Sequence, residues 1–231
     1  MRFHCKMNEY LLLNIVILSF PMAAVFYSKI GYYKKLPQVL FSILVVGSVF
    51  VTWDILATER GHWAFNPAYV LGIRFMGLPV EELMFFVSVP FSCLFIYESL
   101  CTYVRDFSVP FSKNIYVGVA AFILLMAVPS FGREYSFAVF LAAGVFLLFA
   151  AFFLQDLLSS GRYWAYLGIT LLLFIVFNFI LTSLPIVYYG PTMIWGTRFL
   201  TIPLEDFLYN YLMLSLYLGV YIWAKKKVLS Q

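Results

Sequence analysis

Long apolar runs alternate with short polar segments along the whole chain. Seven runs approach the length of about 20 apolar residues that a helix needs to cross a bilayer, and they occupy residues 10–27, 36–58, 78–102, 115–128, 136–158, 164–184 and 202–223. This pattern predicts an all-α, polytopic membrane protein with seven transmembrane helices. Two alternatives stay open: the fourth run is short enough to be a half-buried segment, and the first has features of a cleaved signal peptide.

The chain also repeats itself at an offset of 124 residues (203 − 79), which lays Pro79 on Pro203. Without a gap, the offset pairs Thr58, Pro67, Gly72, Arg74, Phe75, Pro79 and Glu81 with Thr182, Pro191, Gly196, Arg198, Phe199, Pro203 and Glu205. The first three runs fall on the last three, so the fourth run becomes a linker. Because each repeat has an odd number of spans, the linker helix makes the halves parallel, in a 3+1+3 arrangement. The predicted units are residues 1–102, 103–132 and 133–231.

Composition agrees with a membrane protein and sets its orientation. Hydrophobic residues make up 64% of the chain and charged residues 11%, against about a quarter charged in soluble domains. The net charge is +4, but most basic residues lie between the apolar runs, where they orient the protein and do not bind nucleic acid. Nine lysines and arginines on the side of the C-terminus, against six on the other side, predict a cytoplasmic C-terminus.

Cofactor motifs are not found in the sequence. The three cysteines form no C-x-x-C pair, so no zinc site or disulfide scaffold is predicted. No G-x-G-x-x-G loop follows a strand, so no nucleotide cofactor is predicted. The expected chemistry therefore uses neither metal nor cofactor.

Two equivalent acidic segments carry the strongest chemical signal. Residues 79–82 (PVEE) and 203–206 (PLED) each open a helix with proline, which suits a first helical turn, and then place two adjacent carboxylates before a long apolar stretch. A charged side chain inside a span costs about 2.5–3.5 kcal/mol. Asp54 adds a fifth acid, and at the repeat offset it corresponds to Asn178 in the other half. If the halves pack face to face, the carboxylates converge on one cavity.

Helix capping is the alternative explanation for these acids. Carboxylates in a first turn complement the helix dipole, and Arg74 and Arg198 are placed to neutralise them. However, a cap does not require two adjacent acids at equivalent positions, each pair following an arginine.

In a dry cavity, desolvation and like-charge crowding keep one carboxyl protonated, while a helix N-terminus and an arginine favour the ionised form of another. Such an acid and base suit a reaction that adds a proton at one carbon and removes one from another.

Aromatic side chains are the candidates for lining such a cavity. The chain has 26 Phe, 17 Tyr and 5 Trp, and their rings stabilise a carbocation through cation–π contact. The predicted liners are Trp53, Phe85 and Phe86. Three other polar residues are expected in solvent or at the membrane interface: His62, Glu98 and Asp156.

The residues around both acidic motifs resemble the membrane-integral carotenoid cyclases, in the single-chain fused form of lycopene β-cyclase. Residues 53–98 and 178–212 are similar to the two halves of that family, and each contains one P-x-E-[ED] motif. Residues 65–67 (FNP) and 72–74 (GIR) belong to the same context. The second half departs from the family pattern at residues 196–198, where GTR stands in place of GIR.

The resemblance implies proton-initiated ring closure without a cofactor. An acid protonates the terminal double bond of an acyclic ψ end, the neighbouring alkene attacks the tertiary cation, and a base removes a ring proton, which converts lycopene to β-carotene through γ-carotene. The hypothesis assigns Glu81 and Glu205 as the main acid/base residues, either of which can be the proton donor, with Glu82 and Asp206 as their partners and Asp54 sharing or orienting a proton. The candidate substrate contacts are Arg74, Arg198, Asn178, Asn66, Trp53, Phe85 and Phe86.

The implied partners are the membrane and a carotenoid substrate, lycopene, taken from it. Other enzymes of the carotenoid pathway are the candidate protein partners. Within the enzyme class, the alternative is an ε-ring or C50 cyclase or a hydratase acting on the same cation. Outside it, the alternative is a 3+1+3 transporter or a pigment-binding protein.

Overall fold

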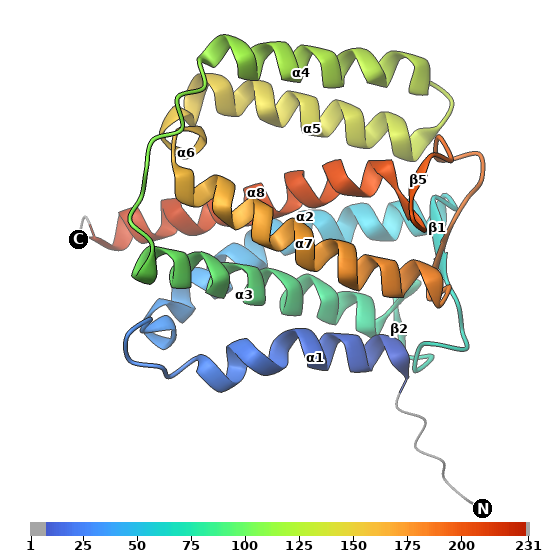
Figure 1. Cartoon of the computed structure of the whole chain (residues 1–231). Helices are drawn as coiled ribbons and strands as arrows, with labels where there is room; N and C mark the ends of the chain where they lie inside the picture. The colour runs from blue at the N-terminus through green and yellow to red at the C-terminus, as the bar shows by residue number, and fades with distance from the viewer. Residues whose placement is uncertain (1–7, 230–231) are drawn as a thin grey trace, which may run out of the picture.

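A computed structural model describes residues 8–229 as helices that run side by side in one bundle (Figure 1). The helices are α1 (Glu9–Ala24), η1 (Tyr32–Lys35), α2 (Leu36–Glu59), α3 (Val80–Tyr103), α4 (Lys113–Ala127), η2 (Val128–Ser130), α5 (Glu134–Phe153), α6 (Gln155–Leu158), α7 (Gly161–Ser183) and α8 (Leu204–Leu229). Short strands gather at one end of the bundle: β1 (Trp63–Phe65), β2 (Arg74–Phe75), β3 (Leu78–Pro79), β4 (Val187–Tyr189), β5 (Arg198–Phe199) and β6 (Ile202–Pro203).

The helices have the length and composition of a multi-pass membrane protein. Among residues 8–229, six helical segments are long and apolar enough to cross a membrane, including α4 with η2 as one segment of 18 residues. The predicted first span is shorter than expected, because α1 ends at Ala24 and has 16 residues. The predicted fifth span also ends early, at Phe153, because Leu154 leaves the helical conformation (φ −124°, ψ 37°).

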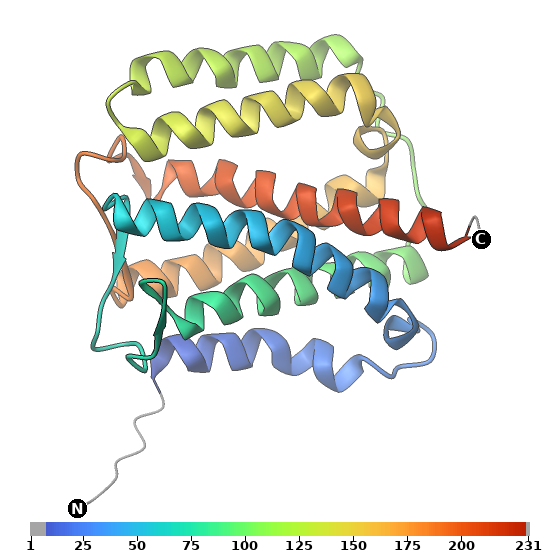
Figure 2. The same ribbon diagram turned by 180° about the vertical axis from the view of Figure 1, so that it is seen from behind.

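The sequence repeat is also a structural repeat. At the same offset, α1, α2 and α3 correspond to α5, α7 and α8. The packing follows this correspondence: α1 packs on α3 as α5 packs on α8, and α2 packs on α8 as α7 packs on α3. Figure 2 shows α2 and α8 lying side by side. The additional helix α4 packs along α5 at the outer edge of the bundle (Figure 1).

A two-fold relation between the halves is visible where β1 pairs with β4. The two strands are repeat counterparts and pair antiparallel, Trp63 with Tyr189 and Phe65 with Val187. The middle pair, Ala64 with Tyr188, therefore lies on the approximate axis. This pairing draws the ends of α2 and α7 together, and both helices carry predicted site residues near those ends.

A tight hairpin precedes each acidic helix, β2 with β3 in the first half and β5 with β6 in the second. Gly72 and Gly196 lie two residues before these hairpins and are aligned by the repeat. They have φ of +84° and +83°, a left-handed conformation that glycine adopts at little cost. Pro79 differs from its predicted place inside the helix. It is extended (φ −66°, ψ 148°) and lies one residue before α3, because it pairs with Arg74 in the hairpin.

Glu98 links three elements at the opposite end of the bundle and is not the interfacial anchor that the sequence predicts. Its side chain is 1% exposed. It forms ion pairs with Lys35 of η1 and with Lys225 of α8, the latter at 2.6 Å, and accepts the hydroxyl of Tyr221 at 2.7 Å. Two cations and a hydroxyl thus satisfy a carboxylate that is otherwise buried in apolar surroundings.

Candidate active site

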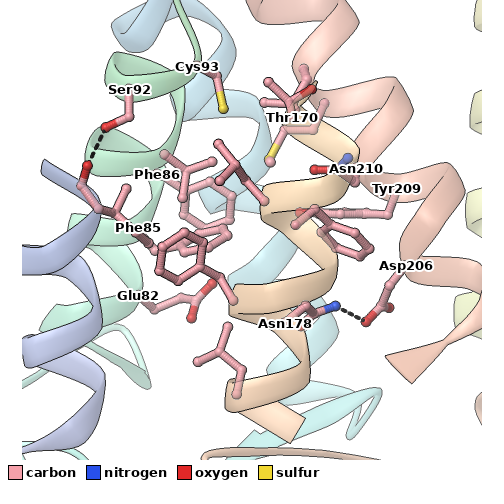
Figure 3. A pocket seen from close by; sticks show the side chains of 18 of the residues that line it. Glu82, Phe85, Phe86, Ser92, Cys93, Thr170, Asn178, Asp206, Tyr209 and Asn210 are labelled. Carbon is pink, nitrogen blue, oxygen red and sulfur yellow. Dashed lines mark hydrogen bonds between the residues drawn. The ribbon is translucent and has the colours of Figure 1, made fainter. Parts of the chain in front are cut away.

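A mostly apolar cavity of about 320 Å³ lies between α1, α3, α7 and α8, near the end of the bundle that holds the strands. This volume is within the usual range for small-molecule sites. Three carboxyls line it: Asp54 from α2, Glu82 from α3 and Asp206 from α8. In Figure 3, Glu82 and Asp206 approach the cavity from opposite sides. Each half of the repeat therefore contributes acid to the same space.

Glu82 and Asp54 form a carboxyl pair with few donors. The hydroxyl of Tyr10 donates to Glu82 Oε2, and Trp63 Nε1 donates to Asp54 Oδ1 at 2.6 Å. Both carboxyls line the cavity, close enough to influence each other's charge. Among the described residues, Asp54 Oδ2 has no hydrogen-bond partner. Two neighbouring buried carboxyls suit a shared proton, because a single proton removes the repulsion between two charges.

Asp206 has a different environment, because three donors surround it. The hydroxyls of Tyr135 and Tyr189 donate to its two oxygens at 2.7 and 2.5 Å, and Asn178 Nδ2 donates at 3.0 Å. Burial, and after it the charge of Asp206, raises the pKa of Tyr189 in β4 well above its ordinary value, so this hydroxyl keeps its proton and remains a donor. Three donors are the complement of a charged carboxylate, which only accepts hydrogen bonds.

Glu81 and Glu205 are buried but do not line the cavity. Glu81 Oε1 accepts the backbone N–H of Leu71 at 2.6 Å, and Glu205 Oε1 accepts the backbone N–H of Trp195 at 2.8 Å. Ser136 also donates to Glu205 Oε1, at 2.5 Å. The sequence predicts that both acidic pairs face one cavity. In the structure one member of each pair, Glu82 and Asp206, lines the cavity. Consecutive residues on a helix point about 100° apart, so only one of two neighbours faces the cavity.

Arg74 and Arg198 lie away from the carboxyls they were expected to neutralise. Both side chains are exposed, and each donates from Nη1 to a carbonyl of its own hairpin, that of Gly77 at 2.7 Å and that of Thr201 at 2.6 Å. Asn66, another predicted substrate contact, accepts a backbone N–H of its own turn at 3.0 Å and does not line the cavity. These three residues shape the loops around the site.

Of the predicted aromatic liners, Phe85 and Phe86 line the cavity and Trp53 does not. The ring of Trp53 lies 5.6 Å from that of His62. His62 was expected in solvent, but it is 1% exposed, and its Nε2 lies 3.1 Å from an oxygen of Glu134. The rings of Trp63 and Tyr135 also lie beside the imidazole, with centroids 6.0 and 6.3 Å away.

Several residues of the site were not predicted from the sequence. Each of them places a polar atom or an aromatic ring on the cavity wall: Tyr10, Trp63, Tyr135, Tyr189, Tyr209 and Asn210. Tyr10 and Tyr135 make equivalent bonds to Glu82 and Asp206. They align only at an offset of 125 (135 − 10), so the ungapped repeat did not pair them.

Loop anchoring gives a first prediction. Replacing Glu81 with alanine leaves the Leu71 N–H without its acceptor, at a cost of about 1–3 kcal/mol. We expect limited proteolysis to cut the loop between β1 and β2 faster than in the unmodified protein. The exposed Glu59→Ala variant is the control and should be cut at the unmodified rate. Equal rates for both variants would contradict the anchoring role.

Comparison with known proteins identifies one family. The family described as lycopene cyclase matches residues 8–100 and 132–224. The two matches start at the offset found in the sequence (132 − 8 = 124), so the family pattern occurs once in each half. Asp54 and Glu82 lie in the first match and Asp206 in the second. No curated protein and no solved structure matches the chain.

Proposed function

The chain belongs to the lycopene cyclase family, and on that premise we propose that it closes the ψ ends of lycopene into β-ionone rings, giving β-carotene through γ-carotene. One observation carries the proposal: an acidic pair and a separate, fully hydrogen-bonded carboxylate face the same apolar cavity. Ring closure needs a proton donor and a proton acceptor and leaves the oxidation state unchanged, so it needs no redox partner.

In this proposal the Asp54–Glu82 pair holds one proton, which relieves the repulsion between two adjacent carboxylates. Glu82 donates this proton to the terminal double bond of the ψ end, and a tertiary cation forms. The π electrons of the neighbouring alkene then close the six-membered ring and move the positive charge onto a ring carbon. Asp206 takes a proton from the adjacent ring carbon, which leaves a ring double bond. One proton enters and one leaves for each ring.

The other residues of the cavity stabilise the cation and exclude water. Aromatic rings attract a cation over their faces, and the rings of Trp63, Phe85, Phe86 and Tyr209 line the space where the charge develops. Because water would capture the cation and give an alcohol, the dry lining favours ring closure. Asn178 orients Asp206 through its amide.

We also propose the membrane topology that the repeat implies. Residues 1–102 and 133–231 form two parallel three-helix halves, residues 103–132 form the linker, and the C-terminus is cytoplasmic. In this 3+1+3 arrangement α1 is a seventh span, about 24 Å long, and a span shorter than the hydrocarbon core is accommodated by local thinning of the bilayer. The substrate then enters the cavity from the membrane in which it dissolves.

The test is expression in a bacterium that accumulates lycopene. We expect red cells to turn orange-yellow, with a product of the same mass as lycopene and the absorption spectrum of a β-ring carotenoid. An ε-ring product has a different spectrum, and a hydrated product is heavier by one water. If the pigment stays lycopene while the protein accumulates in the membrane, the proposed function is wrong.

A further inference from the structure

A second cavity lies next to the first along the bundle. The second cavity, of about 460 Å³, shares Phe20, Phe95 and Ile96 with the first and extends to Ser99 and Tyr103. Both follow α3, on which residues 82 and 103 are 21 positions apart (103 − 82). At 1.5 Å per residue this is about 30 Å, the thickness of the hydrocarbon core of a bilayer. The two neighbouring cavities together therefore have the length that a linear hydrocarbon needs to lie across the membrane.

The repeat predicts an equivalent groove in the second half, between α2, α5 and α8, but larger side chains occupy it at two positions. The counterpart of Cys93, which lines the first cavity, is Tyr217. Tyr217 is fully buried, and its hydroxyl donates to the Phe86 carbonyl at 3.3 Å. Gly47 of α2 lets the helices approach, since a Cβ there would lie 3.3 Å from that hydroxyl. A tyrosine thus occupies the space that a cysteine leaves open.

The outer part of the second groove is also covered. Ser99 lines the second cavity in the first half, and its counterpart at the repeat offset is Trp223. The ring of Trp223 stacks on Phe41 of α2 with 5.9 Å between the ring centroids. Side chains that differ in size at two equivalent positions therefore leave one groove open and close the other.

Resting on the proposed function, we propose that the unreacted part of the substrate lies along α3 in the first-half groove alone, so that each binding event cyclises one end. When one ψ end reaches Glu82, the rest of the chain extends toward Tyr103, about 30 Å from the carboxyls. After the first ring has formed, the second ψ end reaches the carboxyls only if the molecule leaves and enters again in the opposite direction. γ-Carotene is therefore a released intermediate.

An isotope chase in proteoliposomes tests the release. The protein converts ¹³C-labelled lycopene, and unlabelled γ-carotene is added in excess early in the reaction. We expect labelled γ-carotene to accumulate in the unlabelled pool, because each molecule leaves the protein after its first ring has formed. Labelled β-carotene that forms while the γ-carotene pool stays unlabelled would overturn the proposal. If no ring forms even without the chase, the proposed function is wrong instead.

A reciprocal exchange between the halves tests the groove itself. Ser99→Trp places in the open groove the residue found in the closed one, and we expect the turnover of lycopene to fall about tenfold or more because the chain no longer fits. A shorter polyene with the same ψ end should still be cyclised. Trp223→Ser should stay within about twofold of the unmodified rate, because Tyr217 still fills the second groove. Unmodified turnover of lycopene by a well-expressed Ser99→Trp protein would contradict the one-sided groove.

Discussion

Replacing Glu82 with glutamine should leave lycopene unconverted in cells that accumulate the variant protein. The amide keeps the shape of the side chain and still accepts the hydrogen bond of Tyr10, so the fold of the site is preserved. It has no acidic proton for the double bond. Because general acid catalysis contributes about 10²–10⁴-fold to a rate, we expect a loss of that size. Chromatography of extracted pigments, normalised to the amount of membrane-bound protein, measures it.

The matched control is the neighbouring residue. Glu81→Gln keeps an oxygen to accept the Leu71 N–H and changes nothing on the cavity wall, so we expect activity within a few-fold of the unmodified protein. The hypothesis drawn from the sequence alone, in which Glu81 is a main acid or base, predicts the reverse order. An inactive Glu81→Gln protein beside an active Glu82→Gln protein would therefore overturn the assignment made from the structure.

The sequence predicts where the acids lie along the chain but not which of them faces the site. Pro79 and Pro203 mark the starts of two equivalent helices, and the structure has α3 and α8 there. The rotation of a helix about its axis is usually deduced from an apolar stripe. In a bilayer the outward face is as apolar as the inward one, so α3 has no such stripe to distinguish Glu81 from Glu82.

Contacts between segments that are far apart in the chain could not be predicted from the sequence either. Tyr189 reaches Asp206 because β4 pairs with β1, a strand more than a hundred residues earlier. Nothing in the local pattern around either strand predicts that pairing. The position of Arg74 near Glu81 and Glu82 in the sequence predicts that it neutralises them. In the structure the tight hairpin directs its guanidinium to the carbonyl of Gly77 instead.

A second large effect should follow from removing both cations beside Glu98. In the double variant Lys35→Met and Lys225→Met, the carboxylate stays buried at 1% exposure with Tyr221 as its remaining hydrogen-bond donor. A buried charge that loses its partners costs about 3–5 kcal/mol. We expect a marked fall in the temperature at which the detergent-solubilised protein aggregates, followed by size-exclusion chromatography after heating.

Adding Glu98→Gln to the double variant should recover most of that stability, because the uncompensated charge is gone and the amide still accepts the Tyr221 hydroxyl. Glu98→Gln alone should cost less than the double variant. Its two lysines are 27% and 29% exposed, so their ammonium groups turn toward water when the carboxylate is removed. A triple variant no more stable than the double variant would show that the loss comes from packing of the lysine side chains and not from the buried charge.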